Sequence, residues 1–427
     1  MALLPQLAGA APRYAQLLRS QYWSPPKLRA YLQTRLGQTL NAASMIPFYA
    51  ARWGESPRPD DFDRLPILKR TGIGELNESV RSLRSDQRFY TGRSSGSTGI
   101  PAEFLFDATH QRGRFAARAR YLRAHGWGPF RRSAWTIVMP EDIPDHVFLR
   151  SRLFPRNEFL KRFGEFTDLV VWLRKLDPLY LGVLPSVLEG LLQVFERKGE
   201  RVPSLRLIFS GSEVLEDTLR ERTRRILGVE VAEYYGSTEA FLAWQCPRGA
   251  LHVNAEHVLL EVVDDANRPV APGELGRVLV TTLENHLMPL VRYEIGDYAQ
   301  AASGLCPCGR TLPVIGRVAG RGINLFRMTA GRLISPWRII FTLTERPELG
   351  QFQIVQKDID RYLIRYVADR PLGADFETSI RAEIRRLLRS TVAVEFERVA
   401  EIGRTRTGKF MAAISELGLE ATDLPPA

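Results

Sequence analysis

A run of hydroxyl and glycine residues at positions 94–101 has the composition of a phosphate-binding loop. Its glycines let the backbone bend closely around a ligand, so that successive amides can point at an anion, and its hydroxyls add donors for phosphate oxygens. The Gly-Lys-Ser/Thr ending of a P-loop is absent, and a plain Ser/Gly surface loop is the alternative interpretation. The run consists of Ser94, Ser95, Gly96, Ser97, Thr98, Gly99, Ile100 and Pro101.

A second segment, at positions 234–239, combines aromatic, hydroxyl and carboxylate side chains and reads Tyr-Tyr-Gly-Ser-Thr-Glu. It follows an apolar run at 229–232, and α/β proteins bind ligands where such buried strands end. An aromatic ring there can stack on a base, a hydroxyl can contact a phosphate, and a carboxylate can hold Mg²⁺. The alternative interpretation makes Tyr235 a half-buried core residue and Glu239 an exposed acid at the start of a helix.

A third segment, at 292–297, ends in Gly-Asp, and Asp297 is a candidate acceptor for ribose hydroxyls. Lysine is unusually rare in the chain. Lysine and arginine together number 59 and seven of these are lysine, which leaves 59 − 7 = 52 arginines. One of the few lysines, Lys409, directly follows Gly408 near the end of the sequence. This position marks it as a candidate catalytic cation, with an ordinary surface lysine as the alternative.

The chain has only three cysteines, Cys246, Cys306 and Cys308, and His252 lies six residues after the first of them. Three thiolates and one imidazole are the ligand set of a closed, tetrahedral structural zinc site. The Cys-x-Cys spacing is narrower than the usual Cys-x-x-Cys, so three buried free thiols beside a hydrogen-bonded histidine are the alternative. His257 is a second candidate for the histidine ligand. A catalytic cysteine is not favoured, because no adjacent base is evident.

Length and cysteine content limit the class of protein. A chain of 427 residues exceeds the roughly 250–300 residues at which a single core stops growing, so two or more domains are expected. Three cysteines cannot form a disulfide framework, which indicates a reducing compartment. We find no secretory leader pattern and no run approaching the ~18 apolar residues of a membrane span. The sequence therefore predicts a cytoplasmic protein without a membrane span.

The formal net charge is 59 − 48 = +11, which raises the question of a nucleic-acid or other polyanionic partner. The basic residues are scattered as pairs, and no helix-turn-helix or zinc-finger spacing is visible. We therefore expect no nucleic-acid partner. The charge is better explained by arginine spread over solvated faces, with a modest contribution to binding polyanionic small molecules.

Alternating apolar runs and helical patterns predict an α/β protein. The runs at 205–209 and 229–232 are expected to be buried strands whose Gly-containing loops gather at one edge of a sheet. From 251 to 283 the pattern changes to short alternating strands with Pro-Gly turns, which predicts a β-rich module.

A smaller unit is expected after about residue 320. The segment 352–367 predicts a hairpin, apolar residues from 376 to 388 recur at helical spacing, and 392–399 predicts a further strand. A β-β-α-β unit of ~100 residues is a reasonable size for a small C-terminal domain.

Taken together, in this order and at these intervals, the three segments resemble the adenylate-forming superfamily of acyl-CoA synthetases and related ligases. The likeness is greatest to the phenylacetate–CoA ligase and capsular-polysaccharide-biosynthesis branch, and it extends from 42–49 to 408–410. Some members of that branch carry a similar Cys-His-Cys-Cys set. The resemblance implies ATP and Mg²⁺ as cofactors, with structural Zn²⁺ and possible use of CoA.

The resemblance also implies roles for individual residues. The loop from Ser94 to Gly99 would cradle the ATP phosphates, Thr238 would contact the α-phosphate and Glu239 would sit at Mg²⁺. Lys409 would reach both the substrate carboxylate and the α-phosphate. The adenine and ribose contacts would come from Gly211, Ser212, Glu213, Tyr234, Tyr235, Gly236, Asp297 and Arg321.

The fold implied is α/β. A large N-terminal adenylation domain at 1–321, with α/β layers and a β-rich, zinc-bearing module at about 244–312, would be followed by a small α+β lid domain at 322–427. Arg321 matches the arginine near the hinge between the domains. Relatives commonly carry an acidic pair after it, whereas this chain has Gly322, Ile323 and Asn324.

The function implied is that of an AMP-forming ligase, which activates a carboxylic acid as an acyl-adenylate and transfers it to CoA. Aromatic and aliphatic residues at 181–185 and 241–244 favour an aryl or apolar acid. One alternative is transfer to an amine, which would make an amide-forming ligase, and another is a non-catalytic nucleotide-binding relative. No pattern in the sequence specifies an oligomeric state.

Overall fold

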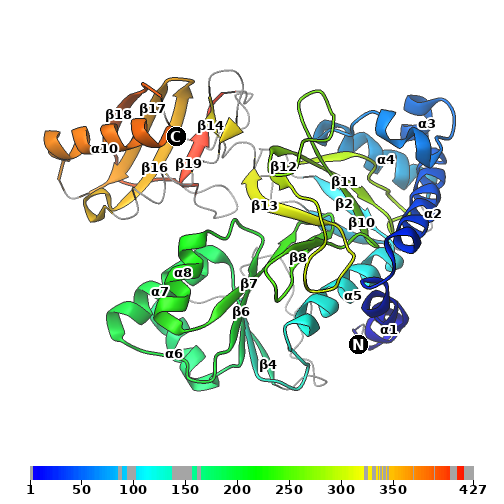
Figure 1. Ribbon diagram of the computed structural model, residues 1–427, viewed down its shortest axis with the longest axis horizontal. Coiled ribbons are helices and arrows are strands. Elements are labelled where there is room, and N and C mark those ends of the chain that lie inside the picture. Colours follow the sequence, from blue (N-terminus) through cyan, green and yellow to red (C-terminus); the bar gives the residue numbers. More distant parts are fainter. Residues whose placement is uncertain are drawn as a thin grey trace. The chain divides into compact units, whose positions relative to one another are not determined.

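Strands and helices alternate through the middle of the chain, and in the computed structural model most of the strands join one large sheet (Figure 1). The structure describes residues 3–84, 89–93, 102–136, 156–160, 165–321, 326–328, 333–334, 336, 339, 343, 346–368, 370–388, 390–403 and 411–417.

The chain divides into two compact units. The large unit comprises residues 1–93, 103–295 and 299–318, and the remaining residues form the small unit. Among the described residues, the helices of the large unit are α1 (Leu3–Ser20), α2 (Pro25–Ser44), α3 (Pro47–Trp53), α4 (Ile73–Leu83), α5 (Ala108–Ala124), α6 (Phe166–Leu176), α7 (Pro185–Lys198) and α8 (Asp217–Leu227), with 3₁₀ turns η1 (Pro59–Arg64) and η2 (Arg70–Gly72).

The large sheet has eleven strands in the order β10-β11-β12-β13-β9-β8-β7-β6-β5-β3-β4. A separate hairpin pairs β1 (Tyr90–Arg93) with β2 (Glu103–Phe106). The strands of the large sheet are β3 (Ser133–Thr136), β4 (Asn157–Leu160), β5 (Tyr180–Gly182), β6 (Leu207–Gly211), β7 (Glu230–Gly236), β8 (Phe241–Gln245), β9 (Leu251–Val253), β10 (Val258–Val263), β11 (Leu275–Thr282), β12 (Tyr293–Ala301) and β13 (Val314–Arg321).

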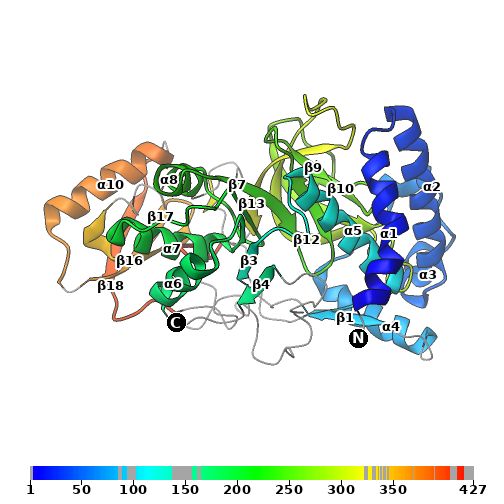
Figure 2. The same ribbon diagram turned by 90° about the horizontal axis from the view of Figure 1, so that it is seen from below.

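Strands β3 to β7 pair in parallel, and α6, α7 and α8 connect β4 to β5, β5 to β6 and β6 to β7. Both views place α6, α7 and α8 together on one side of these strands and α5 with α1 on the other (Figures 1 and 2). Successive side chains of a strand point to opposite faces, so Ile208 of β6 joins the apolar core under α7 and α8, whereas Phe209 contacts Tyr121 of α5. The parallel strands therefore bury both faces and present their carboxyl ends at one edge.

The structure extends the strand expected at 229–232. Strand β7 runs to Gly236 because both of its neighbours pair with it there: Gly211 of β6 lies opposite Tyr234, and Phe241 of β8 lies opposite Gly236. The change from parallel pairing with β6 to antiparallel pairing with β8 occurs at β7. The Tyr-Tyr-Gly-Ser-Thr-Glu segment at 234–239 therefore begins inside the sheet.

The small unit contains a four-stranded sheet in the order β18-β17-β16-β19, covered by α10 (Ala374–Leu388). The predicted hairpin, helix and strand are confirmed, and β19, at the carboxyl end, is a strand that the sequence pattern did not indicate. The described elements of this unit are β14 (Phe326–Arg327), β15 (Leu333–Ile334), η6 (Pro347–Leu349), β16 (Gln351–Asp358), β17 (Arg361–Val367), α10, β18 (Ala393–Arg398) and β19 (Ala413–Ser415).

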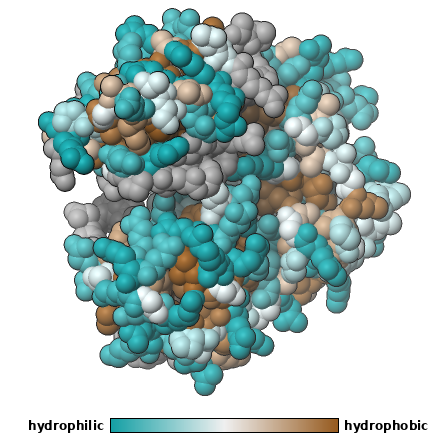
Figure 3. Space-filling view, turned by 60° about the vertical axis from the view of Figure 1, so that its left-hand side comes forward, coloured by the Kyte–Doolittle hydropathy of each residue, from teal (hydrophilic) through white to brown (hydrophobic). Residues whose placement is uncertain are grey.

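Together these units confirm the predicted α/β class. The boundary placed between residues 321 and 322 stays a prediction. Many arginines lie on solvated faces in ion pairs, such as Arg224 with Glu230 at 2.6 Å and Arg361 with Glu395 at 2.9 Å. The face in Figure 3 is mostly hydrophilic. Among the described residues, no helix combines the length and apolar character needed to cross a bilayer.

Candidate functional site

The carboxyl ends of β6 and β7 form the centre of the candidate site. Gly211, the last residue of β6, pairs with Tyr234 of β7, and a Cβ atom at position 211 would clash with the Tyr234 carbonyl oxygen. The missing side chain lets the Tyr234 ring lie against β6, with its hydroxyl 3.4 Å from the Ser212 Oγ. Ser212 has φ of +67°, a left-handed conformation that is uncommon outside glycine and is found at functional loops.

The two adjacent tyrosines of this segment differ in accessibility. Tyr234 is partly exposed, and the Arg118 guanidinium lies 5.9 Å from the centre of its ring. Tyr235 is only 7% exposed and points to the other face of β7. Of the two rings predicted to contact adenine, only that of Tyr234 offers an accessible face, and Tyr235 contributes to the core.

Glu213, in the loop that follows β6, is hydrogen-bonded to the first turn of α7. Its carboxylate accepts a hydrogen bond of 2.9 Å from the backbone N–H of Ser186, in the first turn of α7. A helix amino terminus favours negative charge, because its amides are unpaired and the helix dipole is positive there. The predicted adenine loop is thus held at one end by α7.

The chain turns sharply after β7, and this turn carries Thr238 and Glu239. The backbone N–H of Ser237 donates to the carbonyl of Ala240 at 2.9 Å, and the Ala240 N–H donates to the Ser237 Oγ at 3.3 Å. Glu239 is only 2% exposed, and no helix begins at this turn. The interpretation of Glu239 as an exposed acid at a helix start is therefore wrong.

Thr238 lies beside the strand that leads into the Ser/Gly run. A Cβ atom at Gly92 of β1 would be 2.9 Å from the Thr238 Cγ2, so the two residues are in contact. Strand β1 ends at Arg93, directly before Ser94. The tertiary structure therefore brings the strand that precedes the first segment next to the turn of the second segment, although about 140 residues separate them in the chain.

Helix α5 covers the turn with residues that the sequence reasoning did not identify. Arg114 donates to the carbonyl oxygens of Ser237 and Thr238, at 2.9 Å each. One turn earlier, the His110 ring stacks on Phe106 and lies 4.7 Å from the His257 ring. Burial, together with the positive charges of the groups around it, lowers the pKa of His110 well below its usual value, so this imidazole is neutral at physiological pH.

The far end of the loop after β6 reaches Glu216, immediately before α8. The Glu216 carboxylate is hydrogen-bonded by the Arg317 guanidinium of β13, and Glu233 of β7 is hydrogen-bonded by Arg220 of α8. Burial raises the pKa of Glu216 to about 7; the Arg317 guanidinium opposes this rise, and the nearby Asp217 and Glu233 carboxylates add to it. This loop is therefore anchored through an acid that titrates near neutral pH.

Glu216 should make the stability of the protein depend on pH. The folded-state pKa of about 7 exceeds the ordinary 4.5, so the folded protein holds the extra proton and loses stability as pH rises between these values. The shift corresponds to about 3 kcal/mol at most. We expect Glu216→Gln to reduce this loss, so that its unfolding free energy relative to wild type is higher at pH 8 than at pH 5. Urea unfolding at both pH values measures the difference, and parallel profiles for the two proteins would contradict the assignment.

The remaining predicted nucleotide contacts are distributed as follows. Asp297 is 8% exposed in β12, directly after Gly296, whose φ of +85° favours glycine. Arg321 ends β13, and its side chain lies outside the described residues. The loop from Ser94 to Gly99 and Lys409 also lie outside them. The roles of these residues stay predictions.

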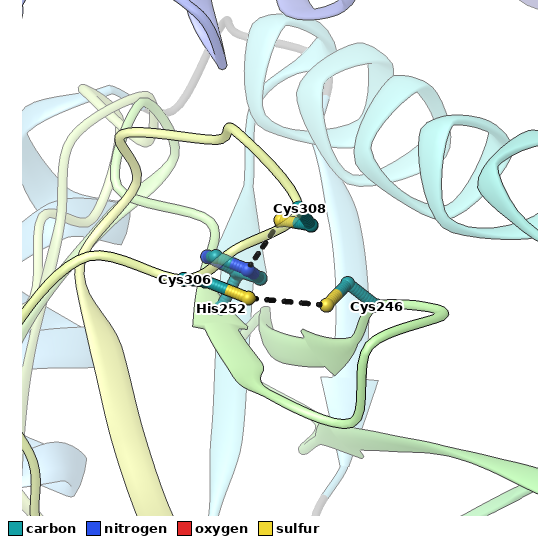
Figure 4. Close-up of side chains that lie close together, drawn as sticks. All are labelled: Cys246, His252, Cys306 and Cys308. Atoms are coloured by element: carbon teal, nitrogen blue, oxygen red, sulfur yellow. Dashed lines mark hydrogen bonds between the residues drawn. The ribbon is translucent and has the colours of Figure 1, made fainter.

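The four predicted metal ligands come together at one place (Figure 4). The ligand atoms of Cys246, His252, Cys306 and Cys308 all lie within 4.8 Å of one another. The Sγ atoms of Cys246 and Cys306 are 3.7 Å apart, and the Cys308 Sγ is 3.3 Å from the His252 Nε2. His257 is not part of this group, because its Nδ1 is 2.6 Å from the Glu284 carboxylate.

The arrangement fits a tetrahedral zinc ion. Zn–S bonds of about 2.3 Å give a sulfur–sulfur separation of about 3.8 Å, close to that observed between Cys246 and Cys306. The His252 Nδ1 lies 3.2 Å from the Leu312 carbonyl, which takes the ring proton and leaves the Nε2 lone pair facing the thiols. Burial raises the pKa of Cys246 to about 11. Burial also acts to raise the pKa of Cys308, but hydrogen bonds from Arg310, Cys306 and Cys246 together lower it.

Two similar turns present the thiols. The sequence reads Cys-Pro-Arg-Gly from Cys246 and Cys-Pro-Cys-Gly from Cys306, and in each turn the glycine N–H donates to the first cysteine's carbonyl. Gly249 and Gly309 have φ of +89° and +80°. Proline at the second position and a left-handed glycine at the fourth favour such turns. The repeated Cys-Pro-x-Gly pattern is a sequence signal for these two turns, and the spacing of the cysteines alone does not reveal it.

The loop that carries Cys306 and Cys308 also connects the N-terminal helices to the sheet. Arg310, after the second turn, donates to the Gln21 side chain at 2.8 Å, and its guanidinium lies 5.1 Å from the Trp244 ring centre. Thr311 donates to the carbonyl of Trp23 at 2.7 Å. The segment between α1 and α2 is thus attached to the loop that carries two of the cysteines.

Comparison with known families gives two matches along the chain. Residues 156–288 match the AMP-binding enzyme family, and residues 328–416 match the CapK C-terminal domain. The chain is 29% identical over 360 residues to a phenylacetate–coenzyme A ligase of Thermus thermophilus, which covers 77% of this chain and 78% of that protein. It is 28% identical over 335 residues to a phenylacetate–coenzyme A ligase of Escherichia coli, covering 71% and 75%.

Solved structures share the fold. A 2-hydroxyisobutyryl-CoA ligase, crystallised in the postadenylation state with an acyl-AMP, superposes with a TM-score of 0.75 at 22% identity and covers 93% of this chain and 92% of its own. An anthranilate–CoA ligase bound to anthranoyl-AMP superposes with a TM-score of 0.57 at 18% identity, covering 75% and 64%. The likeness to the 2-hydroxyisobutyryl-CoA ligase extends over both units of the chain. Both likenesses support the α/β architecture.

Proposed function

Because the chain belongs to the adenylate-forming superfamily, in the branch of the phenylacetate–CoA ligases and proteins with a CapK C-terminal domain, we propose that it activates a carboxylic acid with ATP and transfers the acyl group to CoA. The observation that carries this proposal is the turn after β7. There, Thr238 and the buried Glu239 lie beside the strand that enters the Ser/Gly run, at the carboxyl ends of parallel strands.

The first reaction joins two anions. A carboxylate oxygen of the acid forms a bond to the α-phosphorus of ATP, and the bond from that phosphorus to pyrophosphate breaks. Little proton transfer is needed, so the protein must mainly neutralise and orient the two anions. We assign Thr238 to orient the α-phosphate and Lys409 to bridge the acid and the α-phosphate. Tyr234 and Asp297 are assigned to adenine and ribose.

The second reaction is thioester formation. The sulfur of CoA forms a bond to the acyl carbon, the bond from that carbon to the AMP oxygen breaks, and the thiol proton passes to solvent. If Lys409 acts only in the first reaction, a movable C-terminal domain can remove it before the second.

The residues present suit the two metals that the resemblance implies. Carboxylate and hydroxyl oxygens, such as those of Glu239 and Thr238, are the donors that Mg²⁺ prefers, and bound Mg²⁺ would neutralise phosphate charge. We also propose that a structural Zn²⁺ ion would be held by Cys246, His252, Cys306 and Cys308. These four side chains supply the four ligands of a closed tetrahedral site, in which no coordination position is left for water or substrate.

Pyrophosphate exchange into ATP tests the proposal. The panel contains phenylacetate, anthranilate, 2-hydroxyisobutyrate and o-succinylbenzoate, the acids named for the similar proteins. Exchange that depends on one acid supports adenylation, and no exchange with these or a wider set of aryl and aliphatic acids would favour a non-catalytic relative. Trapped acyl-adenylate is then offered CoA or simple amines. Discharge by amines alone would replace CoA with an amine as the acceptor.

Replacing Glu239 should change the magnesium dependence. Glu239→Gln keeps the size of the side chain but removes its charge, so we expect the Mg²⁺ concentration for half-maximal exchange to rise about tenfold, as expected for a lost ligand or partner of the metal. Exchange measured across a Mg²⁺ series gives this value, and Glu230→Gln, at an exposed carboxylate paired with Arg224 at the other end of β7, is the control. An unchanged Mg²⁺ titration in Glu239→Gln would contradict the assignment.

A further inference from the structure

Arg114 of α5 is hydrogen-bonded to the backbone of the proposed catalytic turn. Its guanidinium donates through one nitrogen to the Thr238 carbonyl and through the other to the Ser237 carbonyl, at 2.9 Å each. Two parallel bonds from one planar group fix the direction of two successive peptide units. The position of the Thr238 hydroxyl and of the chain entering Glu239 therefore follows from the position of Arg114.

The helix that carries Arg114 is itself fixed to β7. Positions 110, 114, 117 and 121 recur at helical spacing on one face of α5, and the Tyr121 hydroxyl donates to the Ala232 carbonyl of β7 at 2.8 Å. At position 113 the helix approaches a buried pair, since a side chain there would clash with the Glu284 carboxylate and lie within 2.9 Å of the His257 Nδ1. Arg114 thus extends from a rigid support.

Hydrogen bonds within the turn leave the Ser237 and Thr238 carbonyls to a donor from outside it, and Arg114 is that donor. The internal hydrogen bonds of the turn use the Ser237 and Ala240 amides, the Ala240 carbonyl and the Ser237 hydroxyl, and the two carbonyls of Ser237 and Thr238 point to Arg114 instead. The Arg114 charge is also attracted by the nearly buried Glu239 carboxylate. The same side chain thereby acts on both the geometry and the charge of the turn.

We propose that Arg114 is a positioning residue for adenylation, which orients Thr238 toward the α-phosphate and holds the Glu239 carboxylate ready for Mg²⁺. This inference rests on the proposed function of the turn. Lysine cannot replace the arginine, because an ammonium group cannot direct two parallel bonds to adjacent carbonyls.

The test compares Arg114→Lys, Arg114→Gln and Arg114→Ala with Arg123→Gln, an exposed arginine at the other end of α5. Pyrophosphate exchange is measured with the panel acid that wild type uses best. We expect both Arg114→Lys and Arg114→Gln to lose about 100-fold in kcat, the size of effect produced by a small misplacement of reacting groups, with the KM for the acid within about threefold.

Two further measurements separate positioning from general stability. Methylguanidinium added to Arg114→Ala should restore at least tenfold of the lost rate, by filling the space of the missing group. Amide hydrogen exchange at Ser237 and Ala240 should be faster in every Arg114 variant, and this readout does not depend on activity.

The outcomes distinguish the two claims. If wild type exchanges pyrophosphate but Arg114→Lys retains kcat within about twofold, the inference is overturned. It is also overturned if the loss only parallels a smaller folded fraction and methylguanidinium restores nothing. If wild type shows no pyrophosphate exchange with any acid, the proposed function fails. If amide hydrogen exchange at Ser237 and Ala240 is also unchanged in the Arg114 variants, the claim that Arg114 holds the turn fails as well.

Discussion

Replacing Lys409 with alanine is expected to lower the rate of pyrophosphate exchange by at least about 100-fold, the effect of removing one preorganised charge from a transition state. Binding of ATP should change by less than about threefold, because the other predicted contacts to the nucleotide remain. The reason is electrostatic, because the attacking carboxylate and the α-phosphate repel each other as they approach. One ammonium group near both anions stabilises this transition state more than it stabilises bound ATP.

The control for Lys409→Ala is Lys198→Ala, an equal change of charge at the exposed end of α7. Exchange kinetics and ATP titration calorimetry measure the two effects separately. Rates near wild type in Lys409→Ala would reject the lysine assignment, whereas equal losses in both variants would point to net charge rather than position.

The second large effect concerns the cysteine cluster. Wild-type protein should contain about one zinc ion per chain, and Cys306→Ser should lose the metal together with about 4 kcal/mol or more of unfolding free energy. The loss is large because the cluster joins β9, the end of β8 and the 306–309 turn, and Arg310 connects that turn to Gln21. Metal analysis and urea unfolding measure both quantities.

A histidine pair provides the control for ligand identity. His252→Ala should lose the zinc, whereas His257→Ala should keep it, because the His257 Nδ1 bonds to Glu284 outside the cluster. Both variants remove a buried imidazole, so a difference in metal content reports ligation rather than folding. Metal-free wild-type protein with full stability would refute the zinc proposal.

Much of the fold was predictable from local patterns. The helix at 376–388 and the hairpin at 352–367 follow from apolar residues at spacings of about four and two, which each element needs to bury one face. The three-residue strand β19 was not predictable, because so short a segment has no periodicity and becomes a strand only by pairing with β16. The end of β7 was misplaced for the same reason, since β8 extends it.

The sequence by itself determined which chemical groups are available to the proposed site. Residues 234–239, the four candidate metal ligands and the rare Lys409 can be identified without coordinates, because each motif lies within a short stretch or uses an uncommon residue. Only the tertiary structure decided how they are arranged. It buried Glu239, gave Tyr234 rather than Tyr235 the accessible ring, and brought Arg114 to the turn. The physical reason is that burial and hydrogen bonding depend on neighbours from distant strands and helices, and one arginine among 52 carries no local mark of the carbonyls it will meet.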